Sequence, residues 1–285
     1  MNLDRRQFFG LGIAASMFAM SEITGYAEAP MTVSNANCWH GLKIGVASYT
    51  FREFSLTDCI KGIQKVDLKY VSVKDMHLPM KSTSEERRGV RQQFLDAGIT
   101  PLSCGVVYFP TDEPGMRNAF EYAKDLGVPT IVCSFDPSSI DTLNGLVKEY
   151  DIKLAIHNHG PGDKRFPRPS DVMELVKGYD KRIGLCIDVG HTLRAGEDPA
   201  DDVLKYRDRL YDMHLKDETK AAPDGQTVEA GRGVMNLKAI FQALLQIKYS
   251  HLASFEYEKD GSDPLPGLAE SVGYCKGLLR GMTNS

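Results

Sequence analysis

The sequence has no excess of basic residues. Its 34 lysines and arginines face 38 aspartates and glutamates, which gives a net charge of -4. Proteins that bind nucleic acid through its phosphates need a basic surface, so this balance argues against nucleic acid as a partner. No GxGxxG loop follows the first expected strand and we find no other phosphate cradle, which argues against a dinucleotide fold and makes a sugar phosphate a doubtful substrate.

The six cysteines form no CxxC pair and match no zinc-ribbon spacing. Three of them fall inside short apolar runs that are typical of buried strands, so we interpret these as small buried side chains: Cys104, Cys133 and Cys186. The other three lie outside such runs, and a disulfide bond among them stays open: Cys38, Cys59 and Cys275.

The apolar stretch near the N-terminus, about residues 10–20, is too short to cross a bilayer, which needs about 20 apolar residues. Arg5 and Arg6 precede this stretch, and Ala27-Glu28-Ala29 follows it with the pattern of a signal-peptidase site. We predict that residues 1–29 are a cleaved signal peptide of the twin-arginine type. It would direct the chain to the periplasm without a membrane attachment. An uncleaved anchor is the alternative.

From residue 42 the sequence repeats one rhythm: a short apolar run, a polar tip and an amphipathic stretch that ends near a glycine. The apolar runs predict eight strands, over residues 42–48, 68–74, 101–107, 129–134, 152–157, 183–188, 210–215 and 252–257. Helical periodicity fills the gaps, over residues 56–65, 84–97, 116–126, 140–150, 170–178, 199–207, 237–247 and 265–279.

Strict alternation of strands and helices means parallel strands joined by right-handed crossovers, and eight such units can close. The mature chain of about 256 residues is close to the ~250 typical of such a barrel. The fold class is therefore α/β, a single-domain (β/α)8 TIM barrel over residues 42–285 with a lead-in over 30–41. An open doubly wound sheet is the alternative.

Histidines gather at the predicted carboxyl ends of the strands, where the functional groups of such barrels lie. Five of the seven fall at or just after a strand end: His77, His157, His159, His191 and His214. This distribution predicts that the active site lies at that end of the barrel.

The fifth to eighth expected strands each end in a residue type that binds metals, and these residues are His157, Asp188, His214 and Glu256. Neighbouring strands lie ~4.8 Å apart, so four consecutive ends can surround one cation with bonds of about 2.0–2.2 Å. Imidazole and carboxylate ligands together suit Mn, Fe, Co, Ni or Zn, with Mg as a further option. A single such residue is usually a capping or hydrogen-bonding group. Four in succession predict one divalent metal ion.

Several motifs together resemble the xylose isomerase-like barrel family of sugar phosphate isomerases and epimerases, which are relatives of endonuclease IV. They are the eight-strand rhythm, the Asp-x-x-His turn at 188–191, and residues 214–217, 231–236 and 254–257. The resemblance covers about residues 42–280 and implies a divalent metal, commonly manganese, held by Glu, Asp, His and Glu. Asp188, His214 and Glu256 match this set, whereas His157 stands where the family usually has glutamate.

The resemblance also implies a small-molecule carbohydrate as substrate. A metal that chelates a carbonyl and a neighbouring hydroxyl acidifies the C–H bond between them, because it stabilises the developing enolate. In the family's ketose epimerases the two glutamates shuttle protons on opposite faces, so His157 weakens the case for an epimerase. We therefore expect a lyase that eliminates a β-substituent from a keto sugar or 3-keto-glycoside. A sugar isomerase or epimerase is the alternative.

Other polar and aromatic side chains near the predicted strand ends are expected to complete the pocket. Besides Glu256, the candidates for proton transfer are His191, Lys216 and Glu258. The candidates for substrate binding are Tyr49, Phe51, Lys74, His77, His159 and Arg232. A packing role is the alternative for Tyr49 and Phe51. A rim charge paired in solvent is the alternative for His159, Lys216 and Glu258.

Three other functions fit the sequence less well. A nuclease would need more metal ligands and a basic groove. A cofactor-free hydrolase would use Asp188 and Glu256 as paired catalytic carboxylates, but these two residues are better explained as metal ligands. A non-catalytic sugar-binding barrel would lack a competent metal site, which metal analysis would reveal. Assembly into a homo-oligomer is left open by the sequence.

Overall fold

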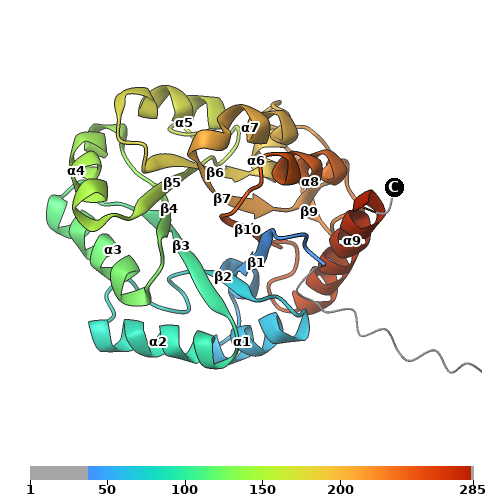
Figure 1. The fold of residues 1–285 in the computed structure, drawn as a ribbon, viewed down its shortest axis with the longest axis horizontal. Coiled ribbons are helices and arrows are strands. Elements are labelled where there is room, and N and C mark those ends of the chain that lie inside the picture. The colour runs from blue at the N-terminus through green and yellow to red at the C-terminus, as the bar shows by residue number, and fades with distance from the viewer. Residues whose placement is uncertain (1–37, 284–285) are drawn as a thin grey trace, which may run out of the picture. The chain divides into compact units, whose positions relative to one another are not determined.

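A closed barrel of eight parallel strands lies at the centre of the computed structural model, which describes residues 38–283 (Figure 1). The strands are β1 Lys43–Ala47, β2 Tyr70–Val73, β3 Thr100–Tyr108, β4 Thr130–Ser134, β5 Lys153–His157, β6 Ile183–Asp188, β7 Leu210–Leu215 and β10 Leu252–Phe255. Each pairs with the next along the chain, and β10 closes the ring against β1. The predicted single-domain (β/α)8 barrel is confirmed.

Helices follow the strands and surround the barrel (Figure 1). They are α1 Leu56–Lys65, α2 Ser84–Asp96, α3 Glu113–Leu126, α4 Ile140–Tyr150, α5 Pro169–Leu175, α6 Val189–Arg194, α7 Pro199–Tyr206, α8 Leu237–Gln246 and α9 Leu265–Thr283. Short 3-10 turns cover Ser48–Phe51, Pro137–Ser139, Val176–Gly178 and Arg207–Arg209.

Local start signals explain several helix boundaries. Thr83 caps α2, since its side chain accepts from the backbone of Glu86 while the Glu86 carboxylate accepts from the backbone of Thr83. The helix therefore begins at Ser84, as expected. Gly127 ends α3 with a φ of 71°, a left-handed conformation that favours glycine.

The core has two parts, one between the strands and the helices and a smaller one inside the barrel. Side chains such as Phe94, Phe120 and Phe241 are fully buried in the outer part, and each contributes roughly 1.5–3 kcal/mol to stability by leaving water. The inner part groups Val132, Ala155, Cys186 and Tyr211. All six cysteines are buried, and none of them forms a disulfide bond.

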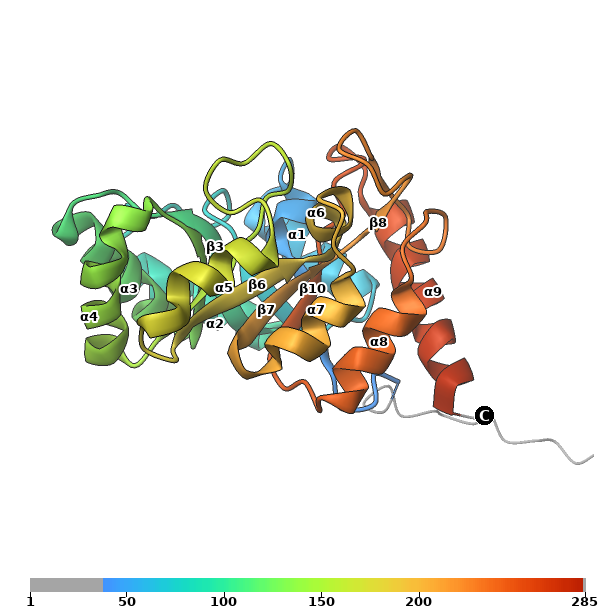
Figure 2. The ribbon, with the colours of Figure 1, turned by 90° about the horizontal axis from the view of Figure 1, so that it is seen from above.

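The loops that follow β5 and β7 rise at one end of the barrel, and α9 runs toward the other (Figure 2). The loop after β7 contains a small antiparallel hairpin, β8 Asp217–Glu218 with β9 Thr227–Val228, which we did not expect. Two residues per strand are too few to give a sequence period. Helix α6 was also missed, because its six residues coincide with the Asp-x-x-His turn.

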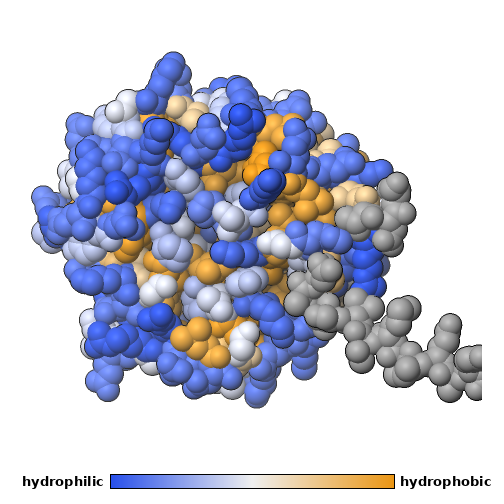
Figure 3. Space-filling model, in the orientation of Figure 1, coloured by the Kyte–Doolittle hydropathy of each residue, from blue (hydrophilic) through white to orange (hydrophobic). Residues whose placement is uncertain are grey.

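No helix among residues 38–283 is long and apolar enough to cross a membrane. The face in Figure 3 is mainly hydrophilic, and its hydrophobic residues lie in separate groups. The predicted signal peptide, residues 1–29, lies outside the described residues.

Candidate metal centre

Four neighbouring strands bring the four predicted ligands together at the carboxyl end of the barrel. His157 and Asp188 are the last residues of β5 and β6, His214 lies near the end of β7, and Glu256 directly follows β10. Alternation along each strand turns these side chains into the barrel, and the register places His214 beside Asp188 on one side. All four are buried, with exposed fractions of 2%, 0%, 1% and 7% in chain order.

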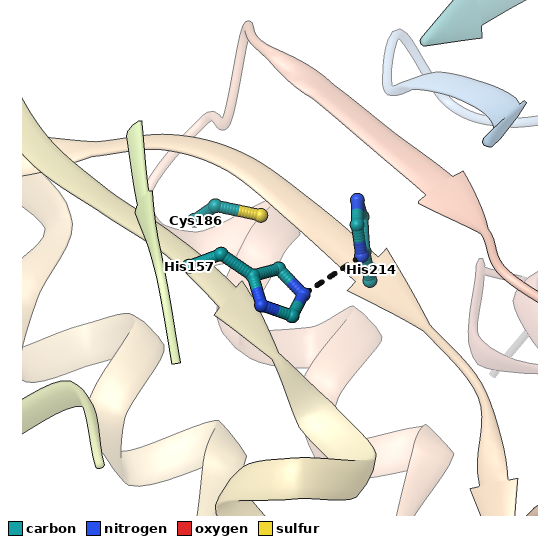
Figure 4. Close-up of side chains that lie close together, drawn as sticks. All are labelled: His157, Cys186 and His214. Carbon is teal, nitrogen blue, oxygen red and sulfur yellow. Dashed lines mark hydrogen bonds between the residues drawn. The ribbon is translucent and has the colours of Figure 1, made fainter. Parts of the chain in front are cut away.

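One atom from each residue faces the same point. His157 Nε2 lies 3.0 Å from His214 Nδ1 and 3.4 Å from Asp188 Oδ2. His214 Nδ1 lies 3.7 Å from Asp188 Oδ2 and 3.0 Å from Glu256 Oε2. All four atoms lie within 4.8 Å of one another. The two imidazoles lie side by side, with one ring nitrogen of each pointing toward the other (Figure 4).

These separations fit ligands of a single cation. Ligand atoms bound at about 2.1 Å lie about 3.0 Å apart at right angles and about 3.4 Å apart in a tetrahedron. Among the described residues, the outer nitrogens His157 Nδ1 and His214 Nε2 have no hydrogen-bond partner, so the inner nitrogens alone contact the other polar groups of the site. The donor chemistry and the distances both suit a divalent transition metal.

Cys186 lies beside the two imidazoles and could form an alternative set of three ligands with them (Figure 4). Burial raises the pKa of its thiol well above the ordinary value, with further contributions from nearby carboxylates. Metals bind the thiolate form. The set with Asp188 and Glu256 is therefore the better donor set.

Lys216 brings a fixed positive charge to the same carboxylates. Its Nζ lies 2.8 Å from Asp188 Oδ2, 2.8 Å from Glu256 Oε2 and 2.7 Å from Glu258 Oε1, and its side chain is only 1% exposed. Gly190 makes room for it, because a Cβ atom there would lie 2.7 Å from Lys216 Cδ. The ammonium group and a bound cation would share two carboxylate oxygens.

The charges around the two imidazoles give them different pKa values. Burial lowers the pKa of His157 to about 4, so this ring is neutral. Burial also disfavours the charged form of His214, but Glu256 and Asp188 outweigh it and raise the pKa of His214 to about 10. Burial would raise the pKa of both carboxyl groups, yet the surrounding cations hold both pKa values well below their ordinary range.

A cavity of about 310 Å³ opens beside this cluster, and it contains several of the predicted residues. His191, Glu258, Tyr49, Lys74 and His159 line it together with His157 and Glu256. The Lys74 Nζ donates to the carbonyl of Val106 at 2.9 Å.

Sequence reasoning missed two residues of the cavity wall, Val106 and Tyr108. Tyr108 is 62% exposed, and its hydroxyl lies 3.1 Å from His159 Nε2. The pairing of β3 with β4 shifts register between Cys104 and Val107, so simple alternation does not give the direction of these side chains. The only signal was the position of Tyr108 at a strand end.

Three of the predicted substrate-binding residues lie elsewhere. Phe51 is fully buried in the core, since its ring packs onto α1, where a Cβ atom on Gly62 would lie 2.5 Å from it. The packing role is therefore correct for Phe51. His77 is 94% buried beside Ser48, with its Nδ1 3.1 Å from that hydroxyl, and it lines a different cavity. Arg232 forms a two-bond ion pair with Glu270 on α9 and does not line the cavity.

Residues 114–278 match the sequence profile of a family described as xylose isomerase-like TIM barrel. The chain belongs to this family. The expected resemblance is thereby confirmed at the level of the family, whose profile spans α3 to α9 and so includes all four clustered residues.

Three proteins to which this chain is similar share little sequence with it. An inosose dehydratase from Lacticaseibacillus casei is 23% identical over 144 residues, which cover 45% of this chain and 48% of that protein. The match thus spans about half the length of this curated relative. A 3-keto-D-glucoside 4-epimerase from E. coli superposes with a TM-score of 0.68 at 14% identity, over 83% of this chain and 99% of that one. The IolI protein with a bound zinc atom gives a TM-score of 0.64 at 20% identity, over 85% and 96%. These likenesses show the shared fold.

Proposed function

We propose that this protein is a divalent-metal-dependent lyase that removes a β-substituent from a keto sugar or a 3-keto-glycoside. The observation that carries the proposal is the convergence of His157, Asp188, His214 and Glu256 on one point at the mouth of the barrel. The relatives named as inosose dehydratases support it, because a dehydratase eliminates water. The solved IolI structure with zinc supports a metal in this fold.

A metal bound by the four residues would polarise the substrate carbonyl and thus acidify the neighbouring C–H bond. Glu258 is placed to take that proton. It lines the cavity, its side chain is 33% exposed, and burial raises the pKa of its carboxyl group above the ordinary value despite the adjacent Lys216. A carboxylate with a raised pKa is a stronger base.

Elimination then breaks the C–O bond to the β-substituent, and the electron pair leaves on that oxygen. Glu258 would pass the proton that it took from carbon to the departing oxygen. Lys216, with its Nζ 2.7 Å from Glu258, would stay protonated, because burial is outweighed by the surrounding carboxylates, which hold its pKa well above the ordinary value. The proton lost from carbon and the proton gained by oxygen balance. The aromatic side chains of Tyr49 and Tyr108 form a wall suited to a sugar ring.

The test is to load the chelator-treated protein with Mn²⁺ or Zn²⁺ and incubate it with a 3-keto-glucoside and, separately, with an inosose. We expect release of the aglycone from the first or formation of the dehydrated product from the second. The activity that is found should disappear with a chelator and in Asp188→Asn. Absence of product from both substrates with a stoichiometrically loaded protein would refute the proposal.

Epimerisation is the second candidate function, and the similarity to the E. coli 3-keto-D-glucoside 4-epimerase favours it. An epimerase needs an acid and a base on opposite faces of the substrate. In D₂O it would incorporate deuterium at the carbon next to the carbonyl without loss of a substituent. This result with no elimination product would decide for the epimerase.

Export to the periplasm belongs to the same proposal, since Arg5, Arg6 and the Ala27-Glu28-Ala29 motif are its basis. The mass of the mature protein tests it. A mature N-terminus at about residue 30 is expected, and an intact chain in the cytoplasmic fraction would contradict it.

A further inference from the structure

His191 is held by an arginine from its own short helix. The Nη2 of Arg194 donates to His191 Nδ1. The opposite ring nitrogen, Nε2, lies 4.0 Å from Asp188 Oδ2, and the ring lines the cavity. One side of the imidazole therefore faces the arginine, and the other faces Asp188 and the cavity.

Arg194 is itself held by the unexpected hairpin. Its Nε lies 3.8 Å from Glu218 Oε1 on β8, and its Nη1 donates to the Gly225 carbonyl at 3.5 Å. Glu218 is fully buried. The hydroxyl of Thr227 on β9 donates to Glu218 Oε1 at 3.4 Å, which ties the carboxylate to the second strand of the hairpin.

A guanidinium group only donates hydrogen bonds and stays protonated in proteins. Its partner nitrogen on the ring must therefore present a lone pair. A neutral imidazole whose Nδ1 is an acceptor carries its proton on Nε2. We infer that Arg194, positioned by Glu218, fixes His191 as the Nε2–H tautomer, so that His191 is a permanent hydrogen-bond donor to a substrate oxygen.

This assignment changes the expected division of roles in the cavity. In the Nε2–H form, His191 has no lone pair on its cavity side, so it is not the base that removes a proton from carbon. Arg194 and Glu218 are positioning residues, because they act on the substrate through His191.

The tautomer can be measured without any enzyme activity. Protein labelled with ¹⁵N at its histidines is studied metal-free and with Zn²⁺ at pH 7.5, and His191→Gln identifies the ring signals of His191. We expect Nε2 of His191 at the shift of a protonated nitrogen and Nδ1 at that of an acceptor. In Arg194→Met we expect a mixture of tautomers, and in Glu218→Gln a smaller change in the same direction.

Arg117→Met is the matched control, because Arg117 is likewise held by neighbouring side chains, Glu113 and Glu149, but on the outside of α3. It should leave the His191 signals unchanged, and circular dichroism establishes that each variant folds. A protonated Nδ1 in the parent protein would overturn the inference. So would unchanged His191 signals in both folded variants at positions 194 and 218.

The catalytic consequence rests on the proposed function, and it is measured separately. With an active enzyme, Arg194→Met should lower kcat about tenfold, in the range typical of residues that orient a functional imidazole, with little change in KM. Absence of elimination activity in the parent would refute the proposed function and leave the NMR result on the tautomer intact. An unchanged kcat alongside a changed tautomer would refute the role of His191 as a donor to the substrate.

Discussion

Replacement of Lys216 by methionine should destabilise the metal-free protein and increase its dependence on a divalent cation. Lys216 Nζ lies within 2.8 Å of three carboxylates in a site from which water is nearly excluded. At an effective dielectric constant of about 20, one unit-charge pair at this distance interacts by about 6 kcal/mol. Desolvation offsets much of this, and breaking a buried ion pair typically costs about 3–5 kcal/mol.

A bound cation can supply the missing charge. We therefore expect Lys216→Met to bind Mn²⁺ or Zn²⁺ more tightly than the parent, and to recover most of the lost stability when the metal is added. A ligand at 100 times its Kd stabilises a protein by about 2.7 kcal/mol. Each tenfold gain in metal affinity adds about 1.4 kcal/mol to this at a fixed metal concentration.

The assay is denaturant unfolding of the parent and Lys216→Met, with a chelator and with increasing metal, alongside calorimetric titration of the metal. Lys74→Met is the control. Lys74 lines the same cavity but donates to the Val106 carbonyl, so its loss should affect the metal much less. Equal metal stabilisation of the parent and Lys216→Met would show that the ammonium group and the cation do not share the carboxylates.

Two further substitutions test the packing and the electrostatics around this arrangement. Gly190→Ala should destabilise the protein by about 1–3 kcal/mol, because its Cβ would lie 2.7 Å from Lys216 Cδ, whereas Gly89→Ala on α2 meets nothing within 4 Å and should be neutral or stabilising in thermal unfolding. Burial and then Glu197 raise the pKa of Asp202 to about 7, from an ordinary value of 3.8. The folded state therefore holds the proton more tightly, and its stability falls as the pH rises from about 4 to 7. Asp202→Asn should accordingly be more stable than the parent by up to about 2 kcal/mol at pH 8 and no more stable than the parent at pH 3.5. An equal difference in the free energy of unfolding between the two proteins at both pH values would contradict the assignment.

The positions of the strands were easier to predict than the directions of the side chains that are not metal ligands. Phe51 and Tyr49 lie in the same turn after β1, yet one packs onto α1 and the other lines the cavity. A 3-10 turn covers both residues, so neither strand alternation nor an α-helical period applies to them. Arg232 was expected near the substrate because of its glycine-rich loop, but Glu270 on a distant helix binds it.

For Lys216 the sequence predicts the direction of the side chain but not its contacts. Its inward direction follows from alternation with His214 along β7. Its contact with three carboxylates depends on the width of the barrel and on the missing Cβ of Gly190, two features contributed by other strands and turns.

The sequence by itself determined the eight-unit barrel, since the barrel strands and the longer helices around them are encoded by their own hydrophobic periods and need no distant partner to be recognised. It also determined which four side chains end neighbouring strands and face inward, because parallel strands expose their carboxyl ends on one side. Only the tertiary structure decided the distances among His157, Asp188, His214 and Glu256, the hairpin that anchors Arg194, and the walls of the cavity. Those features depend on how residues far apart in the chain pack against one another, and a local pattern carries no record of such contacts.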